Sequence, residues 1–349
     1  MKRLYRSLVV GLAALLVMVL LPVSAAAWNR SPATTFATLP AGATPPEGIT
    51  ADAAGNIYVT TFGFPPSGAT STPGQLVVFD RSGRLIRQVT ISGASPHLLG
   101  LAFNPSTSDL LVLDFGAGKV LKVNPHTGAS TVFSDIATQT GLGVGLNALT
   151  FDASGNVYIS DSFQGAIWRI GPSGGIATAW LSDPLLTTIG KPPFGANGLA
   201  FNRSGTAMLV TNTGDDAVIT IPVSGGKAGT PTVLAYGVNG ADGLLIDGDD
   251  NIWVVANQSD EIVVLNPNGK VIAKLGDFDG IDRQGAVQGL LFPASIVASG
   301  EFVYVTNLVL DTRLFGFPTV DSRWAAQVTS YTVSRINRHL SRDRDSGDD

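Results

Sequence analysis

The sequence predicts an all-β fold, a six-bladed β-propeller made of four-stranded antiparallel blades. Three observations lead to this prediction. A short sequence phrase recurs six times at intervals of about fifty residues, which is typical of repeat architectures. Each repeat contains several short runs rich in β-branched and aromatic residues, bounded by turn residues. Between the N-terminal segment and residue 320, we find no capped, helix-periodic stretch of useful length.

The repeated phrase consists of a small apolar stretch, an Asp or Asn, a Gly-containing turn and an alternating strand. The first copy reads Glu-Gly-Ile-Thr-Ala-Asp at 47–52 and leads into Asn-Ile-Tyr-Val-Thr at 56–60. The leading positions of the six copies are residues 47, 99, 147, 197, 242 and 293, so the spacings are 52, 48, 50, 45 and 51. A single such sheet cannot bury both of its faces, so we expect the units to stack around a ring.

Further strands complete each unit and close the ring. In the third unit, the runs 166–170 and 176–180 flank a Gly-Pro-Ser-Gly-Gly turn. The segment 34–39 precedes the first blade, and we predict it to be the outer strand of blade six. We predict the neighbouring strand of that blade at 328–333.

Composition limits the classes of function. The chain of 349 residues has no cysteine, so it contains neither disulfides nor a thiolate zinc site. Its formal net charge of -5 argues against a nucleic-acid partner, because phosphate backbones are bound by clustered Lys and Arg. We expect a monomer.

The N-terminal residues resemble an export signal. Lys2, Arg3 and Arg6 precede an apolar run over 8–21, and small residues follow at 24–27. We predict a signal peptide at 1–27, one propeller domain at 28–338 and a disordered tail at 339–349. The protein is then secreted or periplasmic, without membrane attachment after cleavage. The alternative is an uncleaved anchor, for which 14 apolar residues are short.

The six leading positions are expected to meet at the mouth of the central channel, and four carry side-chain oxygens. Their occupants are Glu47, Leu99, Asn147, Asn197, Asp242 and Pro293. Two buried carboxylates would cost several kcal/mol each, of the order of 5, unless a partner neutralises them. A divalent cation would do so, and oxygen ligands without imidazole or thiolate indicate Ca²⁺. Alternatively, these side chains hydrate the channel or bind neighbouring backbone groups.

The order Glu, gap, Asn, Asn, Asp, gap resembles that of the SMP-30/gluconolactonase/strictosidine-synthase-like superfamily. The matching motifs are Pro-Glu-Gly-Ile, Leu-Asn-Ala-Leu, Ala-Asn-Gly-Leu and Ala-Asp-Gly-Leu, spread over roughly residues 40 to 335. This resemblance implies one calcium ion in the central channel with Glu47, Asn147, Asn197 and Asp242 as its ligands.

The resemblance also implies hydrolysis of a small lactone or ester, in which the ion polarises the substrate oxygen. Asp242 would act as general base or as nucleophile, while Asn147 and Asn197 orient the substrate and the metal. We expect four loops to shape the mouth, and their Phe, Pro and Leu content suggests an apolar or bulky ligand. These loops are 62–74, 181–194, 277–292 and 308–324.

Other features leave a second hypothesis open. Ala148 stands where many hydrolytic relatives have an acidic residue, and Leu99 stands where paraoxonase-like members have a histidine; His97 lies two residues earlier. The chain is therefore alternatively a non-catalytic propeller of the NHL type that binds a protein or glycan on its loop face, with any calcium structural. The Asp-rich segment 247–251 lacks the Gly and Glu of a calcium loop, so we interpret it as a turn.

Overall fold

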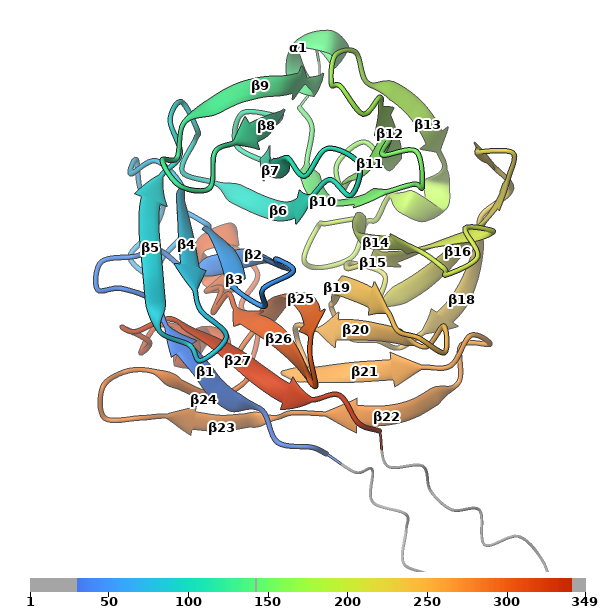
Figure 1. Ribbon diagram of the computed structural model, residues 1–349. Coiled ribbons are helices and arrows are strands. Elements are labelled where there is room, and N and C mark those ends of the chain that lie inside the picture. Colours follow the sequence, from blue (N-terminus) through green and yellow to red (C-terminus); the bar gives the residue numbers. More distant parts are fainter. Residues whose placement is uncertain (1–29, 142, 341–349) are drawn as a thin grey trace, which may run out of the picture.

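The described chain forms six antiparallel sheets that radiate from a central axis (Figure 1), which confirms the predicted six-bladed propeller. The structure is a computed structural model that describes residues 30–141 and 143–340. The predicted signal peptide at 1–27 and the predicted tail from residue 341 onward lie outside the described residues.

The first three blades contain four strands each, ordered from the axis outwards. Blade one consists of β2 (Pro46–Ala51), β3 (Ile57–Thr61), β4 (Gln75–Phe79) and β5 (Leu85–Thr90). Blade two consists of β6 (Leu98–Phe103), β7 (Leu110–Asp114), β8 (Lys119–Val123) and β9 (Ser130–Asp135). Blade three consists of β10 (Leu146–Phe151), β11 (Val157–Asp161), β12 (Ala166–Ile170) and β13 (Thr178–Ser182).

The last three blades follow the same order. Blade four consists of β14 (Ala196–Phe201), β15 (Ala207–Asn212), β16 (Ala217–Ser224) and β18 (Thr232–Tyr236), and the short β17 (Lys227–Ala228) also pairs with β16. Blade five consists of β19 (Ala241–Ile246), β20 (Ile252–Ala256), β21 (Glu261–Leu265) and β22 (Val271–Leu275). Blade six consists of β25 (Pro293–Ser299), β26 (Phe302–Asn307), β27 (Thr332–Asn337) and β1 (Thr34–Thr38).

Blade six joins the two ends of the described chain. Strand β1 is its outer strand, as predicted for 34–39. The predicted neighbouring strand at 328–333 was wrong by four residues, because the chain reaches the sheet only after Tyr331, and it is Thr332–Asn337 that pairs along β26. Between the first and last blades, the Thr306 hydroxyl donates a hydrogen bond of 2.6 Å to the carbonyl oxygen of Glu47.

The helical segments of the described chain are short and lie outside the blades. The helices are α1 (Ile136–Thr140) and α2 (Ser322–Ala325), with the 3₁₀ turns η1 (Pro184–Leu186) and η2 (Thr312–Phe315). The sequence did not indicate α1, a single turn whose N-terminus is capped by Asp135, which accepts a hydrogen bond from the backbone N–H of Thr138. Within the described ranges, none of the helices combines the length and hydropathy needed to cross a membrane. A hairpin of β23 (Phe278–Ile281) and β24 (Val287–Gly289) lies beside β1 at the outer edge of blade six (Figure 1).

The apolar core lies between neighbouring blades. One cluster joins Tyr58 and Val78 of blade one to Leu101 and Val112 of blade two, and similar clusters fill the other blade interfaces. Burial of these faces on both sides of each blade stabilises the ring and fixes the inner strands around the channel.

The Asp of the repeated phrase stabilises the turn between the first and second strands of a blade by accepting hydrogen bonds. In blade five, Asp247 Oδ1 accepts hydrogen bonds from the backbone N–H groups of Asp249 and Asn251, while Oδ2 accepts from Asn251 Nδ2 and Trp253 Nε1. Asp52 makes the same bonds in blade one, with Tyr58 in place of the Trp. The segment 247–251 is therefore a turn, as interpreted from the sequence.

Candidate metal centre in the central channel

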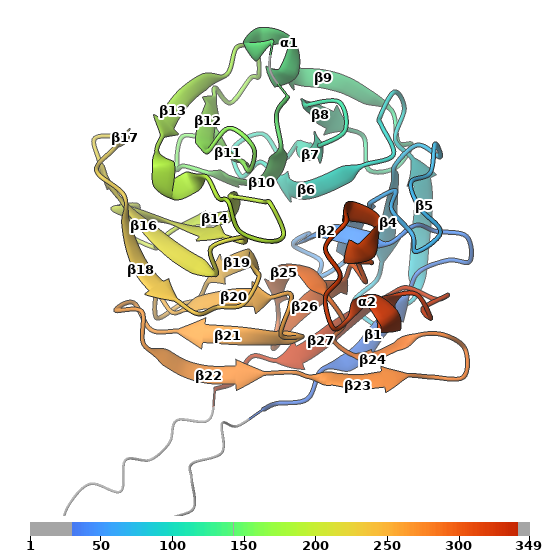
Figure 2. The same ribbon diagram turned by 180° about the vertical axis from the view of Figure 1, so that it is seen from behind.

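The innermost strand of every blade is irregular at its leading residue. The strand register shifts at the first pairs of all six inner strands, for example between Pro46 and Ile49 in blade one and between Ala241 and Leu244 in blade five. Such a bulge re-aims the side chain of the extra residue. At these positions it brings the leading side chain to the channel on the face that carries α2, which Figure 2 shows in front.

Small residues directly after the leading positions let the inner strands approach one another. A Cβ atom on Gly198 would lie 2.6 Å from the carbonyl oxygen of Asp242 and 2.7 Å from the backbone nitrogen of Leu244. Gly243 faces the backbone of blade six in the same way, since its Cβ would lie 2.7 Å from the carbonyl oxygen of Ala294. The glycines of the repeat thus bring the leading side chains close to the axis.

The structure corrects the sixth leading position. Pro293 pairs with Asn307, just as Pro46 pairs with Thr61 in blade one. The residue that follows the pair, Ala294, is therefore the counterpart of Glu47, and the prediction of Pro293 was wrong by one residue. Ala294 is fully buried and contributes no polar atom of its side chain to the channel.

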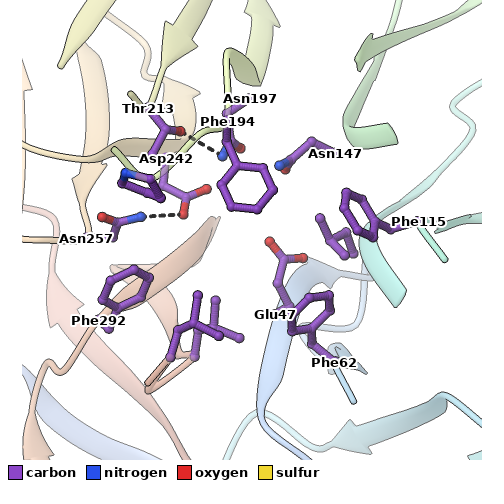
Figure 3. Close-up of a pocket in the computed structure, with 14 residues that line it drawn as sticks. Glu47, Phe62, Phe115, Asn147, Phe194, Asn197, Thr213, Asp242, Asn257 and Phe292 are labelled. Carbon is purple, nitrogen blue, oxygen red and sulfur yellow. Dashed lines mark hydrogen bonds between the residues drawn. The ribbon is translucent and has the colours of Figure 1, made fainter. Parts of the chain in front are cut away.

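All four predicted site residues line one pocket of about 450 Å³, including its open mouth. The carboxyl groups of Glu47 and Asp242 point towards the same space, with Asn147 and Asn197 along its edge (Figure 3). The four side chains come from the inner strands β2, β10, β14 and β19, and each residue is at most 6% exposed.

Burial makes both acids of the pocket costly to ionise. Burial, and then the charge of Asp242, raise the pKa of Glu47 well above its ordinary value. Burial also raises the pKa of Asp242 to about 7, although hydrogen bonds from Asn257, Asn197 and the backbone N–H of Gly243 lower it. Two buried carboxyls held this way favour either bound protons or a nearby cation.

The polar atoms left over in the pocket fit a hard cation. Glu47 Oε2 and Asn257 Oδ1 are buried and have no hydrogen-bond partner within the described residues. Such atoms cost free energy unless a ligand pairs with them. In the described part of the chain no three His, Asp or Glu side chains form a metal cluster, so the candidate centre combines two carboxylates with amide oxygens. Oxygen donors of this kind suit Ca²⁺.

Hydroxyl groups orient the two ring amides. Asn197 Nδ2 donates a hydrogen bond of 2.9 Å to Thr213 Oγ1, which in turn donates to the carbonyl oxygen of Ala241. Asn147 Nδ2 donates to Ser162 Oγ over 3.4 Å, and this hydroxyl donates to the backbone of blade four. With the nitrogen engaged, the Oδ1 atom of each amide is the group that can ligate a cation.

These hydroxyls belong to a second ring of equivalent positions that the sequence interpretation missed. The residue directly after the second strand of each blade lies next to the leading residue, 14 to 16 positions further along the chain. The six occupants are Phe62, Phe115, Ser162, Thr213, Asn257 and Leu308. All of them except Ser162 line the pocket. The position directly after a second strand is the signal that identifies this second ring, and it requires the strand ends to be known.

His97 lies behind the pocket wall. Its ring stacks on Phe64 with centroids 4.4 Å apart and also contacts Phe62. Burial lowers the pKa of His97, against the charge of Asp114, which raises it. It is not one of the pocket-lining residues, although Phe62 in front of it is.

The four loops predicted to shape the mouth each contribute to the pocket. Phe62 comes from 62–74, Phe194 from 181–194, Phe292 from 277–292 and Leu310 from 308–324. Most of the segment 277–292 does not cover the mouth, because it forms the β23–β24 hairpin at the outer edge of blade six. Only its last residue reaches the channel.

The sequence profile of the SMP-30/Gluconolactonase/LRE-like region matches residues 94–276, which are 183 of the 349 residues. The chain belongs to this family. The matched region includes the inner strands of blades two to five and therefore Asn147, Asn197 and Asp242. No curated protein matches the chain in sequence.

Several solved structures share the fold. A luciferin-regenerating enzyme is 16% identical with a TM-score of 0.61, covering 86% of this chain and 93% of its own. Regucalcin from Agrobacterium tumefaciens strain C58, described as a calcium-binding protein, is 17% identical with a TM-score of 0.61, covering 88% and 94%. A candidate gluconolactonase is 18% identical with a TM-score of 0.59, covering 88% and 92%. At these identities the likeness shows the fold alone.

Proposed function

We propose that the protein is a calcium-dependent hydrolase of small lactones or related esters. The observation that carries the proposal is the pair of buried acids, Glu47 and Asp242, which face one pocket together with the oriented amides of Asn147 and Asn197. The family and the lactonase-like and calcium-binding structural neighbours support this assignment.

Glu47, Asn147, Asn197 and Asp242 would hold the ion. Calcium bound there supplies Lewis-acid polarisation of the substrate's carbonyl oxygen. Asn257 Nδ2 donates a hydrogen bond of 2.9 Å to Asp242 Oδ2. Asp242 serves as general base or nucleophile through its other carboxylate oxygen, Oδ1. Thr213 and Ser162 keep the ring amides in place, and the apolar residues at the mouth limit access of bulk water.

A direct test combines metal content with activity. Purified protein is expected to contain one calcium ion per chain and to hydrolyse lactones or aryl esters, with activity lost in chelator and restored by Ca²⁺. Asp242→Asn should reduce kcat by at least about 10³-fold, in the range seen for loss of a catalytic base or nucleophile. Asp152→Asn, which alters a turn in blade three, is the matched control and should retain activity.

The outcomes separate the two hypotheses for this propeller. A protein that lacks calcium, and whose Asp242→Asn and Asn197→Ala variants behave like the wild type, contradicts the proposal. A protein that binds calcium but hydrolyses no lactone or ester is instead a binding propeller of the NHL type with a structural ion.

The location of the protein is part of the proposal. We propose that residues 1–27 are cleaved and that the mature chain is secreted or periplasmic, with a net charge of -5 - 3 = -8. Mass spectrometry of the mature protein from its own host should place the first residue near Trp28. An intact N-terminus in a membrane fraction would contradict cleavage.

A further inference from the structure

The channel has a polar half and an apolar half. In blades three to five, the second-ring residues Ser162, Thr213 and Asn257 are polar and bind the candidate ligands. In blades one, two and six, the same ring holds Phe62, Phe115 and Leu308. The first ring repeats this division, since Leu99 and Ala294 are the two leading residues without side-chain oxygens. Glu47 lies between them.

The apolar half continues from the level of the acids towards the mouth. Leu99 and Leu310 are at most 5% exposed and pack in one cluster with Phe62 and Phe292. Above them, Phe115 lies 6.2 Å from Phe62 and 6.4 Å from Phe194, measured between ring centroids. These contacts join Phe292, Phe62, Phe115 and Phe194 into a continuous apolar wall of the pocket, which reaches Asn197 and Asp242 at Phe194 (Figure 3).

The pocket offers few polar groups besides the candidate metal ligands. Besides the four candidate ligands, only Thr213 and Asn257 are polar among the residues that line it, and no Lys, Arg or His of the described chain does so. Thr213 bonds to Asn197 and to the backbone of Ala241, and the amide nitrogen of Asn257 bonds to Asp242. Outside the candidate ligands, Asn257 Oδ1 is the one unpartnered side-chain acceptor among the described lining residues. A substrate with several hydroxyl groups would therefore lose more hydrogen bonds to water on entry than the pocket replaces.

We propose that the substrate is a lactone or ester with a single polar head and an apolar alkyl or aryl tail, and that polyhydroxylated sugar lactones are excluded. This inference rests on the proposed hydrolase function. The head faces Glu47 and Asp242, and the tail lies along the wall formed by Leu99, Leu310 and Phe194. Phe194 is half-buried at the mouth, so its replacement leaves the blades intact.

The test compares γ-butyrolactone, γ-hexalactone, γ-octalactone and γ-decalactone with glucono-δ-lactone in the calcium-loaded protein. The value of kcat/KM is expected to rise about two- to fourfold per added methylene, as burial of apolar surface requires. It should be at least about 100-fold lower for the sugar lactone than for γ-decalactone. Phe194→Ala should reduce the rise along the series. Phe302→Ala, at the hairpin on the opposite face, should keep the rise while lowering the melting temperature.

The failure of this inference is distinguishable from that of the proposed function. Hydrolysis without a chain-length preference, or a preference for the sugar lactone, overturns the inference and leaves the function standing. Absence of all hydrolysis overturns the function, and the inference is then decided by calorimetry with the hexyl-substituted γ-lactam and the unsubstituted γ-lactam. Binding of the alkyl lactam at least about tenfold tighter, weakened by Phe194→Ala, supports the apolar wall as the tail site. Equal or absent binding overturns it.

Discussion

Asn257 Nδ2 donates a hydrogen bond of 2.9 Å to Asp242 Oδ2, and both residues are buried at the channel. This bond joins the leading residue of blade five to the second-ring residue of the same blade. It lowers the pKa of Asp242 and fixes which carboxylate oxygen faces the open space of the pocket. Asn257 Oδ1 has no partner in the described chain, so this side chain also offers an oxygen to a cation.

Asn257→Ala is expected to weaken calcium binding by about 10- to 100-fold, the usual effect of removing a residue that orients a metal ligand. The physical reason is that Asp242 loses the donor that favours its charged form, so protons compete better with the ion. Isothermal titration calorimetry at pH 7 measures the affinity. Asn156→Ala, which alters a turn in blade three, is the control and should bind calcium as the wild type does. Unchanged affinity in Asn257→Ala would contradict the role of this bond.

The first ring was predictable from the sequence because Glu47, Asn147, Asn197 and Asp242 all start the same repeated phrase. The second ring was not recognised because its six residues share no chemistry: three are polar and three are apolar. Their common feature is a position directly after a strand, which becomes meaningful only when the strand ends are known. The sixth leading residue was misplaced for a related reason, since Pro293 begins a weak copy of the phrase and its strand pairing is needed to find the bulge at Ala294.

The number of blades was predictable because the phrase occurs six times. The outer strand of blade six was predictable because a closed ring needs a strand from the other end of the chain. The predicted strand at 328–333 was misplaced because Val328 and Tyr331 are buried in the core without belonging to the sheet. Both pack in the cluster around Phe36 and Phe79 before the chain enters the sheet. The β23–β24 hairpin was missed because its Gly-rich sequence has few β-branched residues.

Thr213→Val tests the orientation of a ring amide. The substitution keeps the shape of the side chain but removes the hydroxyl that accepts from Asn197 and donates to Ala241. Two buried polar groups then lack partners, at a cost of about 1–3 kcal/mol each. We expect a lower melting temperature together with calcium affinity reduced about tenfold. Thr213→Ser should restore both, and a Val variant with unchanged calcium affinity would show that the hydroxyl does not orient Asn197.

Asp260 gives the protein a pH dependence that is independent of the metal centre. Burial, and then the charge of Asp321, raise its pKa from 3.8 to about 8, although the backbone N–H of Phe292 donates to Oδ1. Because the folded-state pKa lies above the unfolded value, the stabilising contribution is present below about pH 4 and is lost as the pH rises through 8. Asp260→Asn keeps the acceptor for Phe292, and Asn tolerates the positive φ of 51°.

We therefore expect the stability of Asp260→Asn relative to the wild type to be greater at pH 9 than at pH 5, by about 4 kcal/mol. Urea denaturation at the two pH values, with calcium present throughout, measures the difference. Asp216→Asn is a suitable control, because Asp216 also has positive φ and follows a second strand. A wild type whose stability does not fall between pH 5 and pH 9 relative to Asp260→Asn would refute the assignment.

Removal of calcium is expected to destabilise the protein more at pH 8 than at pH 5. In the metal-free protein, the pKa of Asp242 is raised from 3.8 to about 7 and that of Glu47 is raised well above 4.5, so the folded state binds protons that the unfolded state has released. Stability is then highest below about pH 4 and falls as the pH rises through 7, by up to about 4 kcal/mol from Asp242. Calcium replaces these protons, and at a free concentration of about 100 times its Kd it adds about 2.7 kcal/mol.

Differential scanning calorimetry in calcium and in chelator, at pH 5 and at pH 8, measures this effect. The gap between the two melting temperatures should widen with pH, because protons compete with the ion at pH 5 but not at pH 8. The double variant Glu47→Gln with Asp242→Asn removes both charges while keeping the side-chain volumes. Its melting temperature should be the same with and without calcium, and its metal-free form should be more stable than the metal-free wild type at pH 8. A calcium-induced shift that is equal at both pH values would mean that these two carboxyls are not the ligands.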